Sequence, residues 1–260
     1  MLSNNQAKLI RSLQKKKQRD ISGLYVVEGD KLVTEYLESN EEIVILAAKS
    51  EWLSWLDKSM KIEVKDVVEV SDMELKRISS LHTPHNSLAV VKSRKNDLSE
   101  VRLEGSLSIA LDFIQDPGNL GTIIRTAAWF GIKNIICSNN CVDLHNPKVI
   151  QSTMGGMLVT NTHYTDLSEY LEKADKAGIN IYAATLDGIS IYESDFHHDG
   201  IILFGNESMG VSRELLPYIT RKLMIPVGGT IGPGVESLNV ATSAAVICSE
   251  FIRRKNTLAK

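Results

Sequence analysis

Residues 111–125 read LDFIQDPGNLGTIIR, and they lead from an apolar strand through a tight turn into a helix. Pro117 and Gly118 suit the turn, and Asn119 suits the cap at the start of the helix. The free N–H groups at such a helix start attract anions. Taken alone, the stretch favours a capped strand–helix junction that leaves Arg125 on the surface.

The same alternation of strands and helices continues to the C-terminus. Apolar strands are predicted at residues 107–111, 134–137, 158–162, 179–183, 201–204 and 223–226. Helices are predicted at residues 120–130, 148–153, 167–177, 212–218 and 237–253. Near-continuous apolar strands that alternate with helices predict an α/β fold, in which a mostly parallel sheet carries helices on both faces.

Short strands and helices also alternate in the first part of the chain. Helices are predicted at 4–19, 32–37, 52–56 and 73–78, the last with Asp72 as its cap, and strands at 24–27, 43–47, 67–70 and 88–91. Residues 93–105 have few apolar side chains and are predicted to form a linker. The chain is therefore expected to hold a small α/β domain at 1–92 and a larger one at 106–260.

The charge of the whole chain does not indicate a nucleic-acid partner, because its 260 residues carry a formal net charge of −3. A local patch does, in the predicted first helix, where no acidic residue occurs before Asp20. The basic side chains of this helix are Lys8, Arg11, Lys15, Lys16, Lys17 and Arg19. RNA phosphates attract such a patch, although a solvated helix face gives the same pattern.

The cysteines and the apolar runs bear on location and on metal binding. Three cysteines do not make a disulfide framework, and the sequence shows neither a signal peptide nor an apolar run of membrane length. A cytoplasmic protein without membrane contact is therefore expected. Cys137, Cys141 and His145 fall four residues apart, but structural thiols are favoured over a metal site, so no metal is expected.

A second stretch, LFGNESMGVS at 203–212, places a glycine-rich loop between an apolar strand and a helix. It nearly matches a phosphate-binding loop, but Val211 stands where that motif needs lysine, and Glu207 would repel phosphates. Nucleoside triphosphate hydrolysis is therefore excluded. Such a loop can hold an uncharged ring edge or an adenosine hydroxyl; alternatively, it is a turn with a solvated glutamate.

A third stretch, IPVGGTIGPGVESLNVA at 225–241, leads from a strand that ends at Pro226 into the last helix. Ser237 is predicted to cap that helix. Asn239 is an unusual choice for a first helical turn, and it is either a ligand-facing group or a second capping group.

In this order, the three stretches resemble the motifs of the SpoU (TrmH-like) branch of the SPOUT RNA methyltransferases. The resemblance covers residues 106–254, and residues 25–29, YVVEG, resemble the family's substrate-binding domain of ribosomal-protein L30e type. It implies a trefoil knot at the C-terminal end of the sheet, S-adenosylmethionine as cofactor and a homodimer. It also implies methyl transfer to a ribose 2′-hydroxyl of structured RNA, with ribosomal RNA expected rather than transfer RNA.

The resemblance also implies the site residues. Cofactor contacts carried over from the family are Thr185, Gly205, Asn206, Glu207, Gly210, Ile225, Pro226, Ser237, Leu238 and Asn239. Residues around the methyl group and the ribose are Asn119, Arg125, Glu207 and Asn239. We expect Arg125 to hold the target phosphate and 2′-oxygen rather than act as a base, because a guanidinium pKa lies above about 12.

One departure and three alternatives stay open. The loop 228–235 looks several residues longer than is usual in the family, which would reshape the cofactor entrance. The alternatives are a transfer-RNA ribose methyltransferase, a methyltransferase that acts on a base, and an RNA-binding protein of this fold without catalysis.

Overall fold

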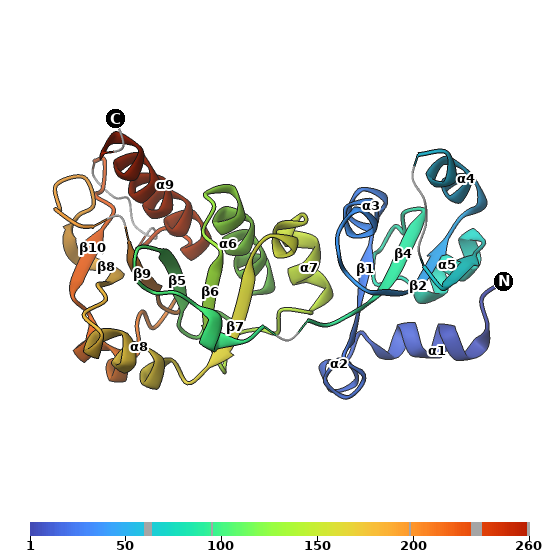
Figure 1. Ribbon diagram of the computed structural model, residues 1–260, viewed down its shortest axis with the longest axis horizontal. Helices are drawn as coiled ribbons and strands as arrows, with labels where there is room; N and C mark the ends of the chain where they lie inside the picture. The colour runs from blue at the N-terminus through green and yellow to red at the C-terminus, as the bar shows by residue number, and fades with distance from the viewer. Residues whose placement is uncertain (60–63, 95, 198, 230–235, 259–260) are drawn as a thin grey trace. The chain divides into compact units, whose positions relative to one another are not determined.

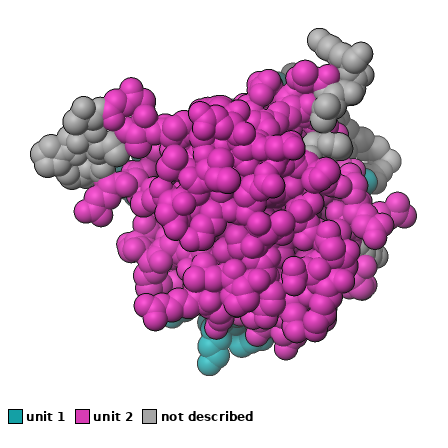
Figure 2. Space-filling model, turned by 90° about the vertical axis from the view of Figure 1, so that its left-hand side faces the viewer, with its two compact units in different colours: residues 1–95, 143–158 teal, residues 96–142, 159–260 magenta. Residues whose placement is uncertain are grey.

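The chain forms two compact units in this computed structural model, which describes residues 1–59, 64–94, 96–197, 199–229 and 236–258 (Figure 1). Unit 1 comprises Met1–Lys95 and Asp143–Leu158, and unit 2 comprises Asn96–Val142 and Val159–Lys260. Figure 2 shows the two units in separate colours. Within the described ranges, no helix is both long enough and apolar enough to cross a membrane.

Unit 1 is built on a four-stranded sheet with the order β1–β4–β2–β3, in which only the β2–β3 pair is parallel. The strands are β1 (Leu24–Glu28), β2 (Ile43–Ala48), β3 (Asp66–Glu69) and β4 (Ser87–Lys92). The helices are α1 (Asn4–Ser12), α2 (Lys16–Ser22), α3 (Asp30–Glu38), α4 (Ser50–Ser59) and α5 (Asp72–Ile78).

Both faces of this sheet are covered, because successive side chains of a strand point to opposite faces. Val26 of β1 joins a core with Ile10 of α1 and Ile78 of α5. Val27, the next residue, joins a second core with Tyr36 of α3 and other residues of α3 and α4. The predicted small α/β domain is thus a three-layer unit.

The predicted single helix at 4–19 is wrong, because the chain turns between α1 and α2. Leu13 is buried at the end of α1, and the backbone of Lys15 is extended. The buried Arg19 donates from Nη1 to the carbonyl oxygens of Leu13, at 2.8 Å, and Gln14, at 2.9 Å. These bonds satisfy carbonyls that the end of a helix leaves unpaired, so the corner is stable.

A second correction concerns the start of α5. Ser71, not Asp72, is its N-cap, and it forms a capping box with Glu74. The Ser71 Oγ accepts from the Glu74 N–H at 3.3 Å, while the Glu74 carboxylate accepts from the Ser71 N–H at 2.9 Å. The helix therefore begins one residue earlier than the sequence predicts.

Residues 143–158 belong to unit 1, whereas the sequence predicts a continuous domain at 106–260. They contain α7 (Pro147–Thr153) and a 3₁₀ turn, η2 (Gly156–Leu158). Ile150 of α7 is buried in the core with α3 and α4, and Gln151 Nε2 donates to the Glu28 carbonyl at 2.7 Å. The predicted strand at 158–162 consequently starts later, at Asn161.

Unit 2 is built on a six-stranded, wholly parallel sheet with the order β10–β8–β9–β5–β6–β7. The strands are β5 (Leu107–Leu111), β6 (Asn134–Ser138), β7 (Asn161–Thr165), β8 (Ile181–Ser190), β9 (Gly200–Phe204) and β10 (Arg221–Met224). The helices are η1 (Leu98–Glu100), α6 (Pro117–Trp129), α8 (Leu167–Lys176), η3 (Arg213–Tyr218) and α9 (Val240–Leu258).

Helices cover both faces of this sheet, which confirms the predicted α/β fold. Ile181 and Ala183 of β8 pack in a core with α8. Tyr182, between them, meets Phe251 of α9 with ring centroids 5.3 Å apart, and α9 in turn packs on α6 (Figure 1). The trefoil knot stays a prediction.

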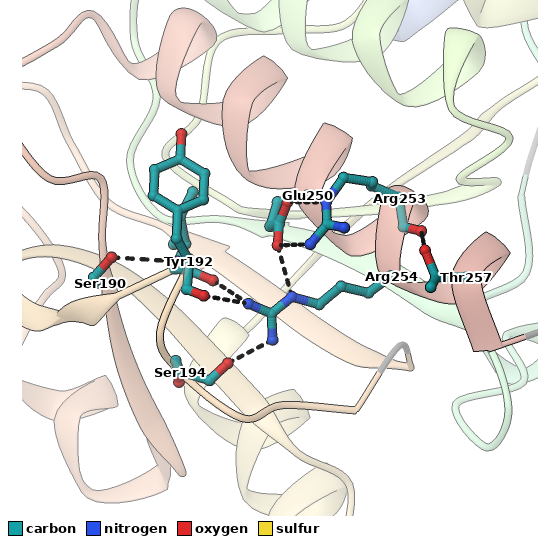
Figure 3. A network of polar contacts seen from close by, with 8 residues as sticks. Ser190, Tyr192, Ser194, Glu250, Arg253, Arg254 and Thr257 are labelled. Carbon is teal, nitrogen blue, oxygen red and sulfur yellow. Dashed lines mark hydrogen bonds and ion pairs between the residues drawn. The ribbon is translucent and has the colours of Figure 1, made fainter.

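The C-terminal half of α9 is tied to the segment that follows β8 (Figure 3). Arg254 donates to the carbonyl oxygens of Ser194, at 2.6 Å, and Ile191, at 2.7 Å, and its guanidinium lies 4.2 Å from the centre of the Phe196 ring. Glu250 pairs with Arg253 and Arg254 at 2.7 Å each. These two pairings outweigh burial and lower the pKa of Glu250 to about 2.

Candidate functional site

Parallel strands bring the three predicted motifs to one edge of the unit 2 sheet. β5 ends at Leu111 and β9 ends at Phe204, and these two residues are paired neighbours. β10 ends at Met224, beyond the intervening strand β8. Since all these strands run the same way, the loops that follow them leave the sheet at its carboxyl edge, where α/β folds bind ligands.

The loop after β5 is bound to the loop after β9. The Asp112 carboxylate, 4% exposed, accepts from the Ser212 N–H at 2.7 Å. Phe113 has a left-handed backbone with φ of 58°, and its carbonyl accepts from Asn206 Nδ2 at 3.0 Å. Asp112 was not among the predicted site residues, although an acid directly after a buried strand is a usable signal for such a role.

The start of α6 corrects one prediction. Asp116, not Asn119, is the N-cap: its side chain accepts from the Asn119 N–H at 2.9 Å. Pro117 occupies the first helical position, where its missing N–H costs no hydrogen bond. The Asn119 side chain therefore does not cap the helix.

The loop after β9 is a closed turn. Asn206 and Gly210 exchange two backbone hydrogen bonds, of 3.0 and 2.9 Å, and Asn206 Oδ1 accepts from two further N–H groups within the turn. A Cβ at position 205 would overlap the backbone of Gly210, and Gly210 itself has φ of +69°. Gly205, Asn206 and Gly210 therefore shape the turn, while Glu207 is exposed.

A chain of side-chain hydrogen bonds links the three motifs. Asn239 Nδ2 donates to Asn119 Oδ1 at 2.9 Å, and Asn119 Nδ2 donates to Glu207 Oε1 at 2.6 Å. We call these three residues the amide–carboxylate chain. They are separated by 88 and 120 residues in the sequence, so only the fold brings them together.

Asn239 has a second task, which corrects the predicted cap of the last helix. Its Oδ1 accepts from the N–H groups of Ala241, at 2.9 Å, and Thr242, at 3.2 Å, directly before α9 begins at Val240. Asn239 rather than Ser237 is therefore the N-cap. One amide thus caps α9 with its oxygen and orients Asn119 with its nitrogen.

Arg125, the fourth residue predicted around the reacting groups, lies on α6 six residues after Asn119. Its side chain is exposed, and among the described residues it has no hydrogen bond or ion-pair partner. Its planar guanidinium is thus available to an anion from outside the protein.

The other predicted cofactor residues flank this edge. Thr185 lies in a five-residue excursion of β8, because Ala183 pairs with Lys222 but Ile189 pairs with Leu223. Ile225 and Pro226 follow β10 and are half-buried, whereas Ser237 and Leu238 are exposed. Residues 230–235 of the loop predicted to be unusually long lie outside the described residues.

Three exposed apolar side chains near this edge were not predicted as site residues. They are Leu186, Met209 and Val227, with exposed fractions between 58% and 69%. Leu186 lies in the excursion of β8, and Met209 and Val227 lie in the loops that follow β9 and β10. In the sequence, an apolar residue within an otherwise polar or glycine-rich loop would have identified them.

The three cysteines are buried free thiols. Cys141 Sγ accepts from the Ile114 N–H at 3.2 Å and thereby supports the loop after β5, while the neighbouring Cys137 lowers the pKa of Cys141 to about 7. His145 stacks on Tyr25 in unit 1, with ring centroids 4.3 Å apart. Within the part of the chain that is described, no group of three His, Cys, Asp or Glu residues could hold a metal ion.

In unit 1, five of the six predicted RNA-binding residues are exposed: Lys8, Arg11, Lys15, Lys16 and Lys17. The sixth, Arg19, is 6% exposed and pairs with Asp143 at 2.5 Å. Arg19 is therefore part of the corner between α1 and α2 and does not reach an RNA surface.

Comparisons with known proteins agree with this geometry. The SpoU rRNA Methylase family profile matches residues 106–249, and the MRM3-like substrate binding domain profile matches residues 4–89. A relative from Bacillus subtilis, the 23S rRNA (guanosine(2553)-2'-O)-methyltransferase RlmP, is 28% identical over 245 residues, which are 94% of each chain.

Two solved structures are similar over nearly the whole chain. A TrmH-family protein from Porphyromonas gingivalis has a TM-score of 0.86 and 37% identity, covering 98% of this chain and 99% of that one. An AdoMet-bound rRNA methyltransferase from Sinorhizobium meliloti has a TM-score of 0.85 and 28% identity, covering 98% and 96%. Since the family profile matches more than half of the chain, this protein belongs to the SpoU rRNA methylase family.

Proposed function

We propose that this protein transfers a methyl group from S-adenosylmethionine to a ribose 2′-hydroxyl of ribosomal RNA. The observation that carries the proposal is the amide–carboxylate chain of Asn239, Asn119 and Glu207, with Arg125 unpaired on the same helix as Asn119. The names of the relatives support it, because the Bacillus subtilis protein is a 2'-O-methyltransferase of 23S rRNA and the Sinorhizobium meliloti structure holds AdoMet.

The residues at the carboxyl edge fit such a donor. S-adenosylmethionine combines a polar nucleoside, a positively charged sulfonium and an apolar ring face. The exposed Glu207 carboxylate suits a cation or a ribose hydroxyl, the turn at 205–210 offers backbone groups, and exposed Leu238 offers apolar area. The proposed contacts are Thr185, Gly205, Asn206, Glu207, Gly210, Ile225, Pro226, Ser237, Leu238 and Asn239.

When bound, the donor supplies an electrophilic methyl group, and the protein's own residues position the acceptor. Asn119 is held at both ends of its amide, so its orientation is fixed before RNA binds. Each amide nitrogen of Asn119 and Asn239 has a second hydrogen that the amide–carboxylate chain does not use. These hydrogens, together with a Glu207 oxygen, can orient a ribose hydroxyl, and positioning of this kind lowers the barrier.

Arg125 complements this arrangement as a clamp. Its guanidinium resists deprotonation, so it donates hydrogen bonds to a phosphate and stabilises the negative charge that develops on the 2′-oxygen. Arg125→Lys keeps the charge but removes the planar fork. We expect a loss of turnover of roughly ten- to hundredfold, since one charged hydrogen bond is worth about 1.5–3 kcal/mol; near-normal turnover would refute the clamp.

The decisive experiment is transfer of tritiated methyl groups to purified RNA, followed by digestion and nucleoside analysis. The proposal predicts label in a 2′-O-methylnucleoside of ribosomal RNA. Label on a base would refute the ribose 2′-hydroxyl as the acceptor. Label only in transfer RNA would refute ribosomal RNA as the substrate. RNA binding without transfer would identify a catalytically inactive member. We also propose a homodimer, which light scattering would test.

A further inference from the structure

A shallow groove lies in unit 1 at the corner between α1 and α2. Its lining residues are Lys8, Arg11, Ser12, Lys15 and Gln18, and its volume is about 320 Å³. Lys8 and Arg11 are three residues apart on α1 and therefore share one helix face. Lys15 and Gln18 follow the turn, and the bend there makes these side chains line a groove rather than the straight face of one helix.

The groove is preformed, because buried contacts hold the corner that shapes it. Arg19 lies on α2 and donates to the last carbonyls of the α1 side, while its Nη2 pairs with Asp143. On α1, Ile10 and Leu13 are buried in the core of unit 1. No ordering of this corner is therefore required when a ligand binds, which favours affinity.

The charge of the groove has a single sign. Within the described residues, Lys8, Arg11 and Lys15 have no acidic partner; Arg11 Nε only reaches the Ala7 carbonyl at 3.4 Å. The first 23 residues carry six basic side chains and one acidic one, whereas the remaining 237 residues carry a formal net charge of −8. An otherwise acidic chain thus concentrates unpaired positive charge at one corner.

We propose that this groove is a phosphate-binding subsite for the RNA backbone, in which Lys8, Arg11 and Lys15 contact phosphates and Arg19 contacts none. The inference rests on the proposed function, since it names how unit 1 holds the RNA that unit 2 methylates. Phosphate contacts position a nucleic acid without reading its sequence, so the groove contributes affinity and orientation but no base preference.

The test measures binding of the full-length protein to a fluorescent RNA hairpin over a range of potassium chloride concentrations. The triple variant Lys8→Gln, Arg11→Gln, Lys15→Gln removes the groove's charges. We expect weaker binding for hairpins of unrelated sequence, and a slope of log K against log salt that is smaller by roughly two, because each phosphate contact contributes about 0.7–0.9.

The matched control, Lys31→Gln, Lys76→Gln, Lys173→Gln, removes three positive charges from exposed sites on α3, α5 and α8. An equal fall in slope for both triple variants would show that only net charge matters, and would overturn the subsite. Binding of inorganic phosphate that the triple groove variant loses, together with RNA binding that this variant keeps, would assign the groove to free phosphate and overturn it too.

Methyl transfer separates this inference from the proposed function. With ribosomal RNA as substrate, the groove variant should show a raised KM and an unchanged kcat, because unit 2 is intact. An unchanged KM would overturn the subsite and leave the enzyme activity standing. RNA binding that depends on the groove, without any methyl transfer by the unmodified protein, would refute the proposed function and leave the subsite standing.

Discussion

Glu250→Gln tests how strongly α9 is anchored. The side chain of Glu250 is 6% exposed, and its pairs with Arg253 and Arg254 lower its pKa from 4.5 to about 2. Each tenfold change in an acid constant corresponds to about 1.4 kcal/mol, but the Arg253 side chain is 62% exposed, so solvent screening reduces the stabilisation to about 1–2 kcal/mol. Glutamine loses that charge, and we expect a fall in Tm of roughly 2–8 °C by circular dichroism at pH 7.

The sign of the pH dependence follows from the direction of the pKa shift. Because the folded pKa is depressed, this stabilisation is complete above pH 4.5 and is lost as pH falls from about 4.5 towards about 2. The stability difference between the protein and Glu250→Gln, measured by urea unfolding, should therefore shrink over that range.

The matched control is Glu172→Gln, because Glu172 pairs with Lys176 at the same spacing of four residues but is 45% exposed. Exposed pairs of this kind contribute about 0.3–0.5 kcal/mol. Similar Tm values for the two variants at pH 7, or a Glu250→Gln deficit that is as large at pH 2 as at pH 7, would refute the anchoring role of Glu250.

Three further variants test the site and the corner. Asn239→Ala should lower Tm by about 2–4 °C, the cost of a lost helix cap. Asn239→Asp should keep the cap but reduce methyl transfer about tenfold, because the hydrogen-bond donor to Asn119 is lost. Equal activity of Asn239→Asp and the unmodified protein would contradict this. Gly205→Ala should abolish donor binding measured by calorimetry, since its Cβ would overlap the backbone of Gly210; unchanged affinity would show that the turn adapts. Arg19→Met should destabilise unit 1 by about 3 kcal/mol in urea unfolding, because it leaves Asp143 unpaired. A change below 1 kcal/mol would show that Arg19 does not stabilise the corner between α1 and α2.

Local sequence patterns were sufficient for the main elements of unit 2. The strand predicted at 107–111 is β5 as observed, and continuous apolar strands between helices indicated the parallel sheet. The three motif loops were predictable because each joins a strand end to a helix start. That Asn119, Glu207 and Asn239 meet came from the family resemblance, since no local pattern carries contacts across 88 and 120 residues.

The features that were missed depend on distant partners. Arg19 looks like one more basic residue, and only Asp143, 124 residues later, shows that it is buried. Ile150 is equally apolar whichever core it enters, so residues 143–158 could not be assigned to unit 1. The excursion of β8 at 184–188 is set by its pairing with β10, where a Cβ on Gly188 would come within 2.7 Å of the Lys222 backbone.

The most direct test of the account is calorimetric titration of the folded protein with S-adenosylhomocysteine, the demethylated form of the donor. If the excursion of β8, the loops after β9 and β10 and the start of α9 form one donor site, the titration should saturate at one molecule per chain. Glu207→Ala should weaken the binding while leaving the circular dichroism spectrum unchanged. Absence of any binding heat from well-folded protein over a range of temperatures would contradict the central claim.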